Sequence, residues 1–152
     1  MPKPPFFAPL ALALSLSLAA CSGDKEDGKN SQPGGFLETP LLAQGPSIRN
    51  VSVAEARALI DTDSAITILD VRTPAEFEQG HLRGAVNLDA MSDDFAERVA
   101  QLKKDDAYLI HCRSGRRSAA ALETMRAAGF SAVAHMNEGV NGWTQAGLPL
   151  EP

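Results

Sequence analysis

The sequence contains few of the residues that build disulfide frameworks and metal sites. Its 152 residues include 2 cysteines, 3 histidines, 1 tryptophan and 1 tyrosine. Two cysteines and three scattered histidines do not make a metal-ligand set, so we expect no metal centre. The net charge of −5 argues against binding to nucleic acid. There is also no glycine-rich loop of the kind that holds nucleotide phosphates. The remaining composition, 44% hydrophobic and 22% charged residues, is that of an ordinary globular protein.

The first twenty residues have the layout of an export signal. Lys3 precedes an apolar run from Leu10 to Leu18, which is too short to span a membrane comfortably. The run leads into Leu18-Ala19-Ala20-Cys21, which resembles the lipobox of bacterial lipoproteins. The resemblance implies a lipoprotein signal peptide over residues 1–20 and a lipid on Cys21. An ordinary cleaved signal and an uncleaved anchor are the alternatives.

Lipidation of Cys21 would anchor an exported protein on a membrane, facing the periplasm or the cell exterior. Each buried methylene of an acyl chain adds roughly 0.8 kcal/mol to anchoring, so several chains hold firmly. Ser22 follows the cysteine instead of an aspartate, which favours the outer membrane in a Gram-negative cell. Residues 21–47 are rich in Gly, Ser, Pro and charged residues, and this composition predicts a flexible tether.

The second cysteine, Cys112, lies where an apolar run from Ala107 to Ile110 passes into a helical pattern. The free N–H groups and the dipole at a helix start favour an anion there. Three arginines follow within five residues, namely Arg113, Arg116 and Arg117. We expect their charge to lower the pKa of the Cys112 thiol and hold it as a thiolate. A buried inert thiol, the alternative, would have apolar neighbours.

Strand and helix patterns alternate from residue 48 to the end. Apolar runs predict strands at 48–51, 65–71, 85–88, 107–110 and 132–136. Capping boxes predict two helices that start at Ser52 and Thr73. A third helix is predicted from a cap at Ser92 to Leu102, with one apolar face, and a fourth follows the Cys112 loop and ends near Ala128, before Gly129. The last helical turn is predicted over 140–146. The alternation predicts an α/β fold, a mostly parallel central sheet with helices on both faces. Ligands bind such sheets at the carboxyl ends of the strands, where Cys112 lies.

Three separated stretches carry a family signature. They are Ile68 to Asn87, the Cys112 loop, and Glu138 to Trp143 followed by Gly147-Leu148-Pro149. Together they resemble the rhodanese-like sulfurtransferases, with Glu138-Gly139 where a Gly-Gly pair is commoner. The resemblance covers residues 48–152 and implies one rhodanese domain.

The resemblance implies that Cys112 is catalytic and that the rest of its loop binds the substrate: Arg113, Ser114, Gly115, Arg116, Arg117 and Ser118. The expected enzyme is a thiosulfate sulfurtransferase. The thiolate would attack the sulfane sulfur of thiosulfate, release sulfite, and pass the sulfur from a persulfide to cyanide or a thiol. Arg116 and Arg117 are expected to attract the dianion, and Arg113 to point outward. No metal or organic cofactor is needed.

Other residues of the three stretches are expected to have structural roles. These are Asp70, Arg72, Glu76, His81 and Trp143. An acid and a base at a strand end more often tie loops together than perform chemistry. His111 adjoins the cysteine, but neighbouring side chains of a strand point to opposite faces, so we do not expect it to act as a base.

Two other functions and one other sulfur donor are alternatives to the transfer of sulfur from thiosulfate by turnover. Phosphatases and arsenate reductases of related fold carry an arginine six positions after the cysteine, where this chain has Ser118. Enzymes that use 3-mercaptopyruvate usually have small residues in place of Arg113 and Arg116. The remaining alternative is a persulfide carrier or regulatory binding module without turnover.

Overall fold

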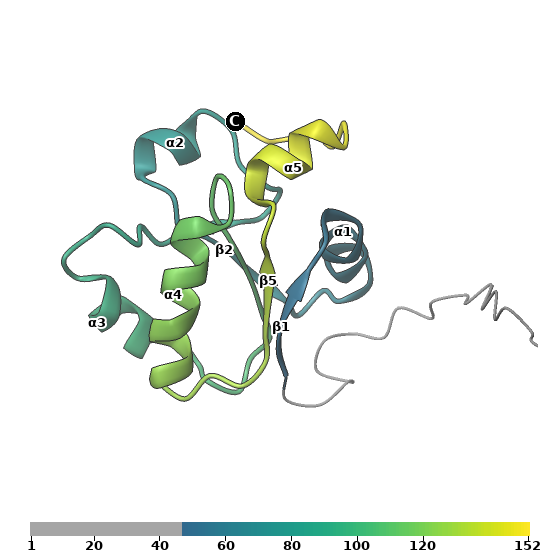
Figure 1. Cartoon of the computed structure of the whole chain (residues 1–152). Helices are drawn as coiled ribbons and strands as arrows, with labels where there is room; N and C mark the ends of the chain where they lie inside the picture. Colours follow the sequence, from purple (N-terminus) through teal and green to yellow (C-terminus); the bar gives the residue numbers. More distant parts are fainter. Residues whose placement is uncertain (1–46) are drawn as a thin grey trace, which may run out of the picture. The chain divides into compact units, whose positions relative to one another are not determined.

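A computed structural model describes residues 47–152, which form a five-stranded sheet with helices on both faces (Figure 1). The predicted signal peptide, the predicted lipid site at Cys21 and nearly all of the predicted tether lie outside these residues. In the described part, the helices are too short or too polar to cross a membrane.

The strand order is β1-β5-β4-β2-β3, and every neighbouring pair is parallel. The strands are β1 (Ile48–Val51), β2 (Thr67–Asp70), β3 (Val86–Asn87), β4 (Tyr108–His111) and β5 (Val133–Met136). The helices are α1 (Val53–Thr62), α2 (Pro74–Glu78), α3 (Phe95–Ala100), α4 (Arg116–Ala127) and α5 (Gly139–Gln145). The predicted α/β fold with a parallel sheet and helices on both faces is confirmed.

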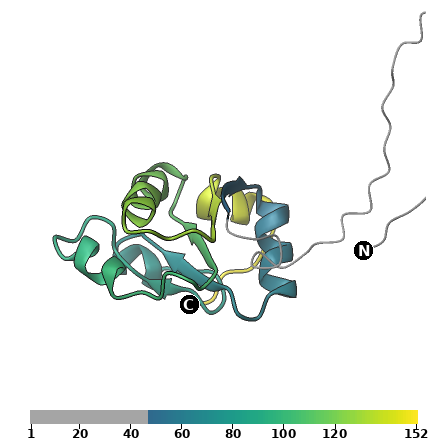
Figure 2. The same cartoon turned by 90° about the horizontal axis from the view of Figure 1, so that it is seen from below.

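Two apolar clusters fill the space on either side of the sheet. Helices α1 and α5 contribute Val53, Ala56, Leu59, Val140 and Trp143 to one cluster. The other cluster contains residues of α3 and α4, among them Phe95, Leu122 and Met125. Figures 1 and 2 show α1 and α4 on opposite sides of the sheet from two directions. Both faces are thus dry, as a parallel sheet requires.

The alternation of side chains along β4 decides which face the cysteine joins. Tyr108, Ile110 and Cys112 belong to the cluster beneath α3 and α4, whereas Leu109 belongs to the cluster beneath α1 and α5. His111 follows the alternation of Leu109. Cys112 and His111 therefore point to opposite faces, as predicted.

Both predicted capping boxes are present. The Ser52 and Thr73 side chains accept from the backbone N–H groups of Glu55 and Glu76, whose carboxylates accept in return. Gly129 ends α4 with a φ of 91° in the left-handed region, also as predicted.

The predicted cap at Ser92 is wrong. Helix α3 begins at Phe95 after Asp94, without a side-chain cap, and ends at Ala100 instead of Leu102. The Ser92 hydroxyl donates to the Asp94 carboxylate and the Ser92 carbonyl accepts from the Phe95 N–H, so Ser92 belongs to a turn that precedes the helix.

Candidate active site

Cys112 lies at the carboxyl end of β4, immediately before the turn that starts α4. Gly115 precedes the helix with φ 84° and ψ −21°, a left-handed conformation that favours glycine. This turn brings the backbone N–H groups of Ser114, Arg117 and Ser118 close enough to the Cys112 sulfur to lower the pKa of its thiol, and the Ser118 hydroxyl donates to the sulfur at 3.4 Å. The side chain itself is almost fully covered, with 1% of the residue exposed. The site is therefore a cradle of backbone donors around one sulfur atom.

The pKa of the Cys112 thiol is lowered, but the cause differs from the predicted one. Burial, the largest influence, raises the pKa, since a thiolate is poorly solvated in the interior. The Ser118 hydroxyl and the three backbone N–H groups together outweigh it by donating to the sulfur. The thiolate is stabilised mainly by hydrogen bonds at the start of a helix.

The three arginines of the loop lie in different surroundings. Arg113 and Arg116 are exposed. Arg117 is half-buried, and its Nη1 and Nη2 donate to Glu76 Oε2 and Oε1 at 2.6 and 2.7 Å. Glu76 is the main cause of the raised pKa of Arg117, with a smaller contribution from the charge of Cys112. One of the three cations expected to act on the thiol is therefore paired with a carboxylate.

Glu76 has a larger part in the site than its predicted structural role. It closes the capping box of α2 and also binds Arg117, 41 residues further along the chain. The hydrogen bonds from Arg117 are the main reason why the pKa of Glu76 falls from 4.5 to about 2. The carboxylate therefore joins α2 to the start of α4.

A second turn supports the cysteine loop from behind. A Cβ atom on Gly139 would lie 2.4 Å from the Cys112 carbonyl oxygen, and one on Gly115 would lie 1.9 Å from the Asn137 carbonyl oxygen. The N–H groups of Val140 and Asn141 donate to the carbonyls of Cys112 and Arg113, both at 2.9 Å. The two backbones touch without side chains between them, which explains why these glycines accompany the cysteine.

A buried ion pair lies at the end of the neighbouring strand. Arg72 Nη2 lies 2.6 Å from Asp70 Oδ2 and also donates to the Gly80 carbonyl at 2.8 Å. Both side chains are buried, so the charges compensate each other away from water. His111 Nε2 lies 4.0 Å from the same carboxylate. Burial lowers the pKa of His111 more than Asp70 raises it, so this imidazole is neutral.

His81 and Trp143 hold the end of the chain in place. The His81 ring stacks on Phe77 with centroids 3.8 Å apart, and its backbone exchanges two hydrogen bonds of 2.8 Å with Glu151. Trp143 Nε1 donates to the Pro149 carbonyl at 2.9 Å. Neither side chain contacts Cys112, so both have the structural surroundings expected of them.

Comparison with known proteins now identifies the family. A family model described as the rhodanese-like domain matches residues 52–146. The chain belongs to the rhodanese-like family.

Relatives and solved structures agree with this assignment. The chain is 38% identical over 93 residues to the chloroplastic thiosulfate sulfurtransferase 16 of Arabidopsis thaliana, covering 55% of this chain and 78% of that protein. It is 35% identical over 98 residues to YrkF of Bacillus subtilis, covering 64% of this chain but only 52% of YrkF, about half its length. A crystal structure of a rhodanese-related protein from Thermoplasma volcanium matches 68% of this chain and 97% of its own, with 30% identity and a TM-score of 0.59.

The rhodanese domain contains a site residue that the sequence alone did not reveal. Ser118 Oγ lies 3.4 Å from Cys112 Sγ and 2.8 Å from His135 Nε2. His135 Nδ1 in turn lies 2.9 Å from Asn50 Oδ1. No local pattern marks His135, because β5 meets the cysteine loop only in the folded sheet.

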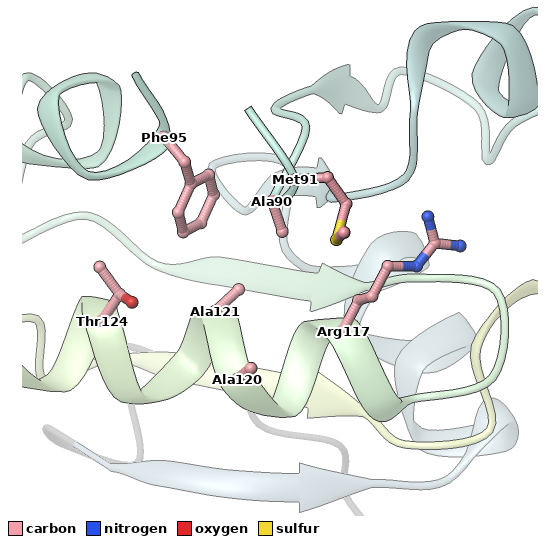
Figure 3. Close-up of a pocket in the computed structure, with 7 residues that line it drawn as sticks. All are labelled: Ala90, Met91, Phe95, Arg117, Ala120, Ala121 and Thr124. Atoms are coloured by element: carbon pink, nitrogen blue, oxygen red, sulfur yellow. The ribbon is translucent and has the colours of Figure 1, made fainter. Parts of the chain in front are cut away.

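An open pocket of about 140 Å³ lies beside the cysteine loop of the rhodanese domain. Residues 90, 91 and 95 face α4 across it, and Figure 3 shows Arg117 at one end. The side of the pocket formed by residues 90, 91 and 95 is apolar, and it is open to solvent at Met91, which is 68% exposed. Residues 47–152 contain no group of three histidine, cysteine or acidic side chains that could hold a metal ion.

We predict that Glu76→Gln destabilises the rhodanese domain in a pH-dependent way. Glutamine still completes the capping box but cannot form an ion pair with Arg117. The loss in unfolding free energy should be about 1 kcal/mol at pH 7. Because the folded-state pKa of Glu76 is about 2 against an ordinary 4.5, the difference should fade as the pH drops from 4.5 towards 2.

Urea unfolding at pH 7, 4 and 2.5 measures this difference. Glu78→Gln is the matched control, since Glu78 is exposed on the same helix and forms no ion pair within residues 47–152. A loss of equal size at pH 7 and pH 2.5 would contradict the prediction.

Proposed function

We propose that this chain is a thiosulfate sulfurtransferase that works through a persulfide on Cys112. The observation that carries the proposal is the cradle around the sulfur: the Ser118 hydroxyl lies 3.4 Å from Cys112 Sγ, and the backbone N–H groups of Ser114, Arg117 and Ser118 lower the pKa of the thiol. A cradle of this kind holds a single anionic sulfur and continues to hold it when a second sulfur is attached.

The proposed reaction has two balanced steps. The Cys112 thiolate attacks the outer sulfur of thiosulfate, the sulfur–sulfur bond of the donor breaks, and sulfite leaves with the bonding electrons. Cyanide or a thiolate acceptor then attacks the outer sulfur of the persulfide and restores the Cys112 thiolate. No electrons enter or leave overall, so the cycle needs no redox cofactor.

Two exposed arginines are suited to attracting the donor. Arg113 and Arg116 flank the cradle and are free to turn towards an anion, whereas Arg117 is held by Glu76. The loop holds Ser118 six positions after the cysteine, where the related phosphatases carry an arginine that binds phosphate. The small Ser118 side chain donates to the sulfur instead, which favours sulfur over phosphate chemistry.

The names of the relatives support the same class of reaction. The Arabidopsis relative is named a thiosulfate sulfurtransferase. The name of YrkF proposes a sulfur-carrier role, which corresponds to the alternative without turnover. The two functions share the Cys112 persulfide and differ in whether a small acceptor regenerates the thiolate repeatedly.

The first test of this function is Cys112→Ser. Purified protein supplied with thiosulfate and cyanide should release thiocyanate over many turnovers, and the serine variant should release none. Mass spectrometry of the wild-type protein after thiosulfate alone should find one added sulfur on the Cys112 peptide. An unmodified Cys112 would exclude the mechanism, and a persulfide formed without turnover would favour the carrier. Rates with mercaptopyruvate and a phosphate ester, measured in parallel, distinguish the other donors and chemistries.

We predict that Arg116→Ala raises the KM for thiosulfate several-fold with little change in kcat. Loss of one exposed cation near a dianion should cost roughly 1 kcal/mol of binding, or about fivefold, and less at high salt. Arg126→Ala is the matched control, because Arg126 is exposed at the other end of α4. Equal KM values for both variants would remove Arg116 from donor binding.

We further propose that the protein is an exported lipoprotein, anchored through Cys21 and facing the periplasm or the cell exterior. The support is the sequence Leu18-Ala19-Ala20-Cys21 after an apolar run. In a Gram-negative host, Ser22 favours the outer membrane as its destination.

Cys21→Ala should abolish labelling by a radioactive fatty acid and release the protein from the membrane fraction. Cys112→Ser, which removes the other thiol, is the matched control and should be labelled normally. Continued labelling of the Cys21 variant would contradict the lipid site.

A further inference from the structure

A chain of hydrogen bonds runs from the Cys112 sulfur across the sheet to its edge. Ser118 Oγ lies 3.4 Å from Cys112 Sγ and 2.8 Å from His135 Nε2, and His135 Nδ1 lies 2.9 Å from Asn50 Oδ1. Asn50 and His135 are paired in register on β1 and β5. Four elements, β4, α4, β5 and β1, thus supply one continuous network.

The amide oxygen of Asn50 determines which nitrogen of the ring carries the proton. An oxygen can only accept, so Nδ1 must donate to Asn50, and in the neutral ring Nε2 then has a free lone pair. Burial lowers the pKa of His135 more than the nearby Gly115 carbonyl raises it. The resting imidazole is therefore neutral, with Nε2 ready to accept a proton from Ser118.

We propose that His135 is a positioning residue that takes the proton of the Cys112 thiol through the Ser118 hydroxyl. The Cys112 S–H bond breaks as an O–H bond forms at Ser118 Oγ, and the original Ser118 proton moves to His135 Nε2. The products are a thiolate and an imidazolium. One proton has moved, and no other reactant is needed.

Every group of the network has a hydrogen-bond partner both before and after the proton transfer. Before transfer, Cys112 donates to Ser118 and Ser118 donates to His135. After transfer, the His135 Nε2–H group donates to Ser118, and Ser118 donates to the thiolate, whereas Asn50 accepts from Nδ1 throughout. The Ser118 hydroxyl can also point to the Gly115 carbonyl at 3.0 Å, but that acceptor cannot take the proton away.

The surroundings of His135 contain no competing charge among the described residues. Its hydrogen-bond partners from β1 and α4 are the neutral Asn50 and Ser118, and its neighbour in register on β4 is Ile110. The side chains that α4 buries against the sheet are Ser118, Ala121, Leu122 and Met125, all uncharged. Arg49 on β1 pairs instead with Glu55 at 3.8 Å. Cys112 is therefore the titratable group to which Ser118 connects His135.

The experiment measures the alkylation rate of Cys112 in the full chain by iodoacetamide between pH 5 and 9.5, followed by mass spectrometry of the Cys112 peptide. This uncharged reagent reports the thiolate and needs no sulfur donor. Although the inference deepens the proposed function, a failure here is thus distinguishable from a failure of sulfur transfer.

In the variant His135→Gln, the side chain can still hydrogen-bond to Ser118 but cannot hold an extra proton. Loss of the imidazolium should raise the thiol pKa by about one unit, so alkylation at pH 6 should slow roughly tenfold. Above pH 9 the two rates should converge, since the thiol is ionised in both proteins. His81→Gln, at a histidine that stacks on Phe77, is the matched control and should keep the wild-type profile.

Two further variants test the route and the direction of the effect. Ser118→Ala removes both the route to His135 and a direct donor to the sulfur, so it should slow alkylation at pH 6 at least as much as His135→Gln, and the double variant should be no slower than Ser118→Ala. Asn50→Asp places a carboxylate against Nδ1, favours the imidazolium, and should extend the reactivity of Cys112 to lower pH.

A His135→Gln profile that superimposes on the wild type would overturn the proposal. So would a loss by the same factor at every pH, which is the result expected of a purely structural residue. If His135→Gln does not fold, Asn50→Asp decides, because its site is on an exposed edge-strand residue. If Asn50→Asp leaves the alkylation rate of Cys112 unchanged at low pH, the proposal would also be overturned.

Discussion

The site depends on backbone N–H groups held close to one buried sulfur, where they lower the pKa of its thiol. That arrangement requires the backbone to turn sharply between β4 and α4, which the left-handed Gly115 allows. The turn has room only because a second backbone, at Asn137 and Gly139, approaches it without side chains. The cysteine loop and the turn before α5 are therefore one structural unit, although they lie about 25 positions apart in the sequence. The parallel sheet supplies the common edge at which they meet.

Charged side chains near the site mainly hold this edge together. The Asp70–Arg72 pair is buried beneath the neighbouring loop, and Arg72 also binds the Gly80 carbonyl. The Glu76–Arg117 pair connects α2 with α4 across the surface. A buried ion pair contributes little net stability, but a conformation that separates the two charges is strongly destabilised. The buried Asp70–Arg72 pair and the half-buried Glu76–Arg117 pair tie together the loops near Cys112, whereas backbone N–H groups lower the pKa of its thiol.

The fold, and the place of Cys112 at the start of a helix, could be predicted because their signals are local. The box of Thr73 and Glu76 spans three residues, and the apolar run before Cys112 is continuous. The contacts that modify the site are long-range: Glu76 and Arg117 are 41 positions apart, and Asn50 and His135 are 85. No pattern within a helix or strand reports such pairs. The error at Ser92 has a different cause, since the Ser92 hydroxyl donates to the side chain of Asp94 and the helix begins only at Phe95.

The near-complete burial of Cys112 also sets how far its chemistry can reach. With 1% of the residue exposed, the sulfur lies below the protein surface, out of contact with any bulky partner. A sulfur–sulfur bond is about 2 Å long. In the proposed cycle, the outer sulfur of the persulfide would therefore lie one bond length nearer to the surface than Cys112 Sγ. Only slender donors would reach Cys112 to form the persulfide, whereas larger acceptors could reach its outer sulfur. The shape of the entrance would thus select different molecules for the two steps of the reaction.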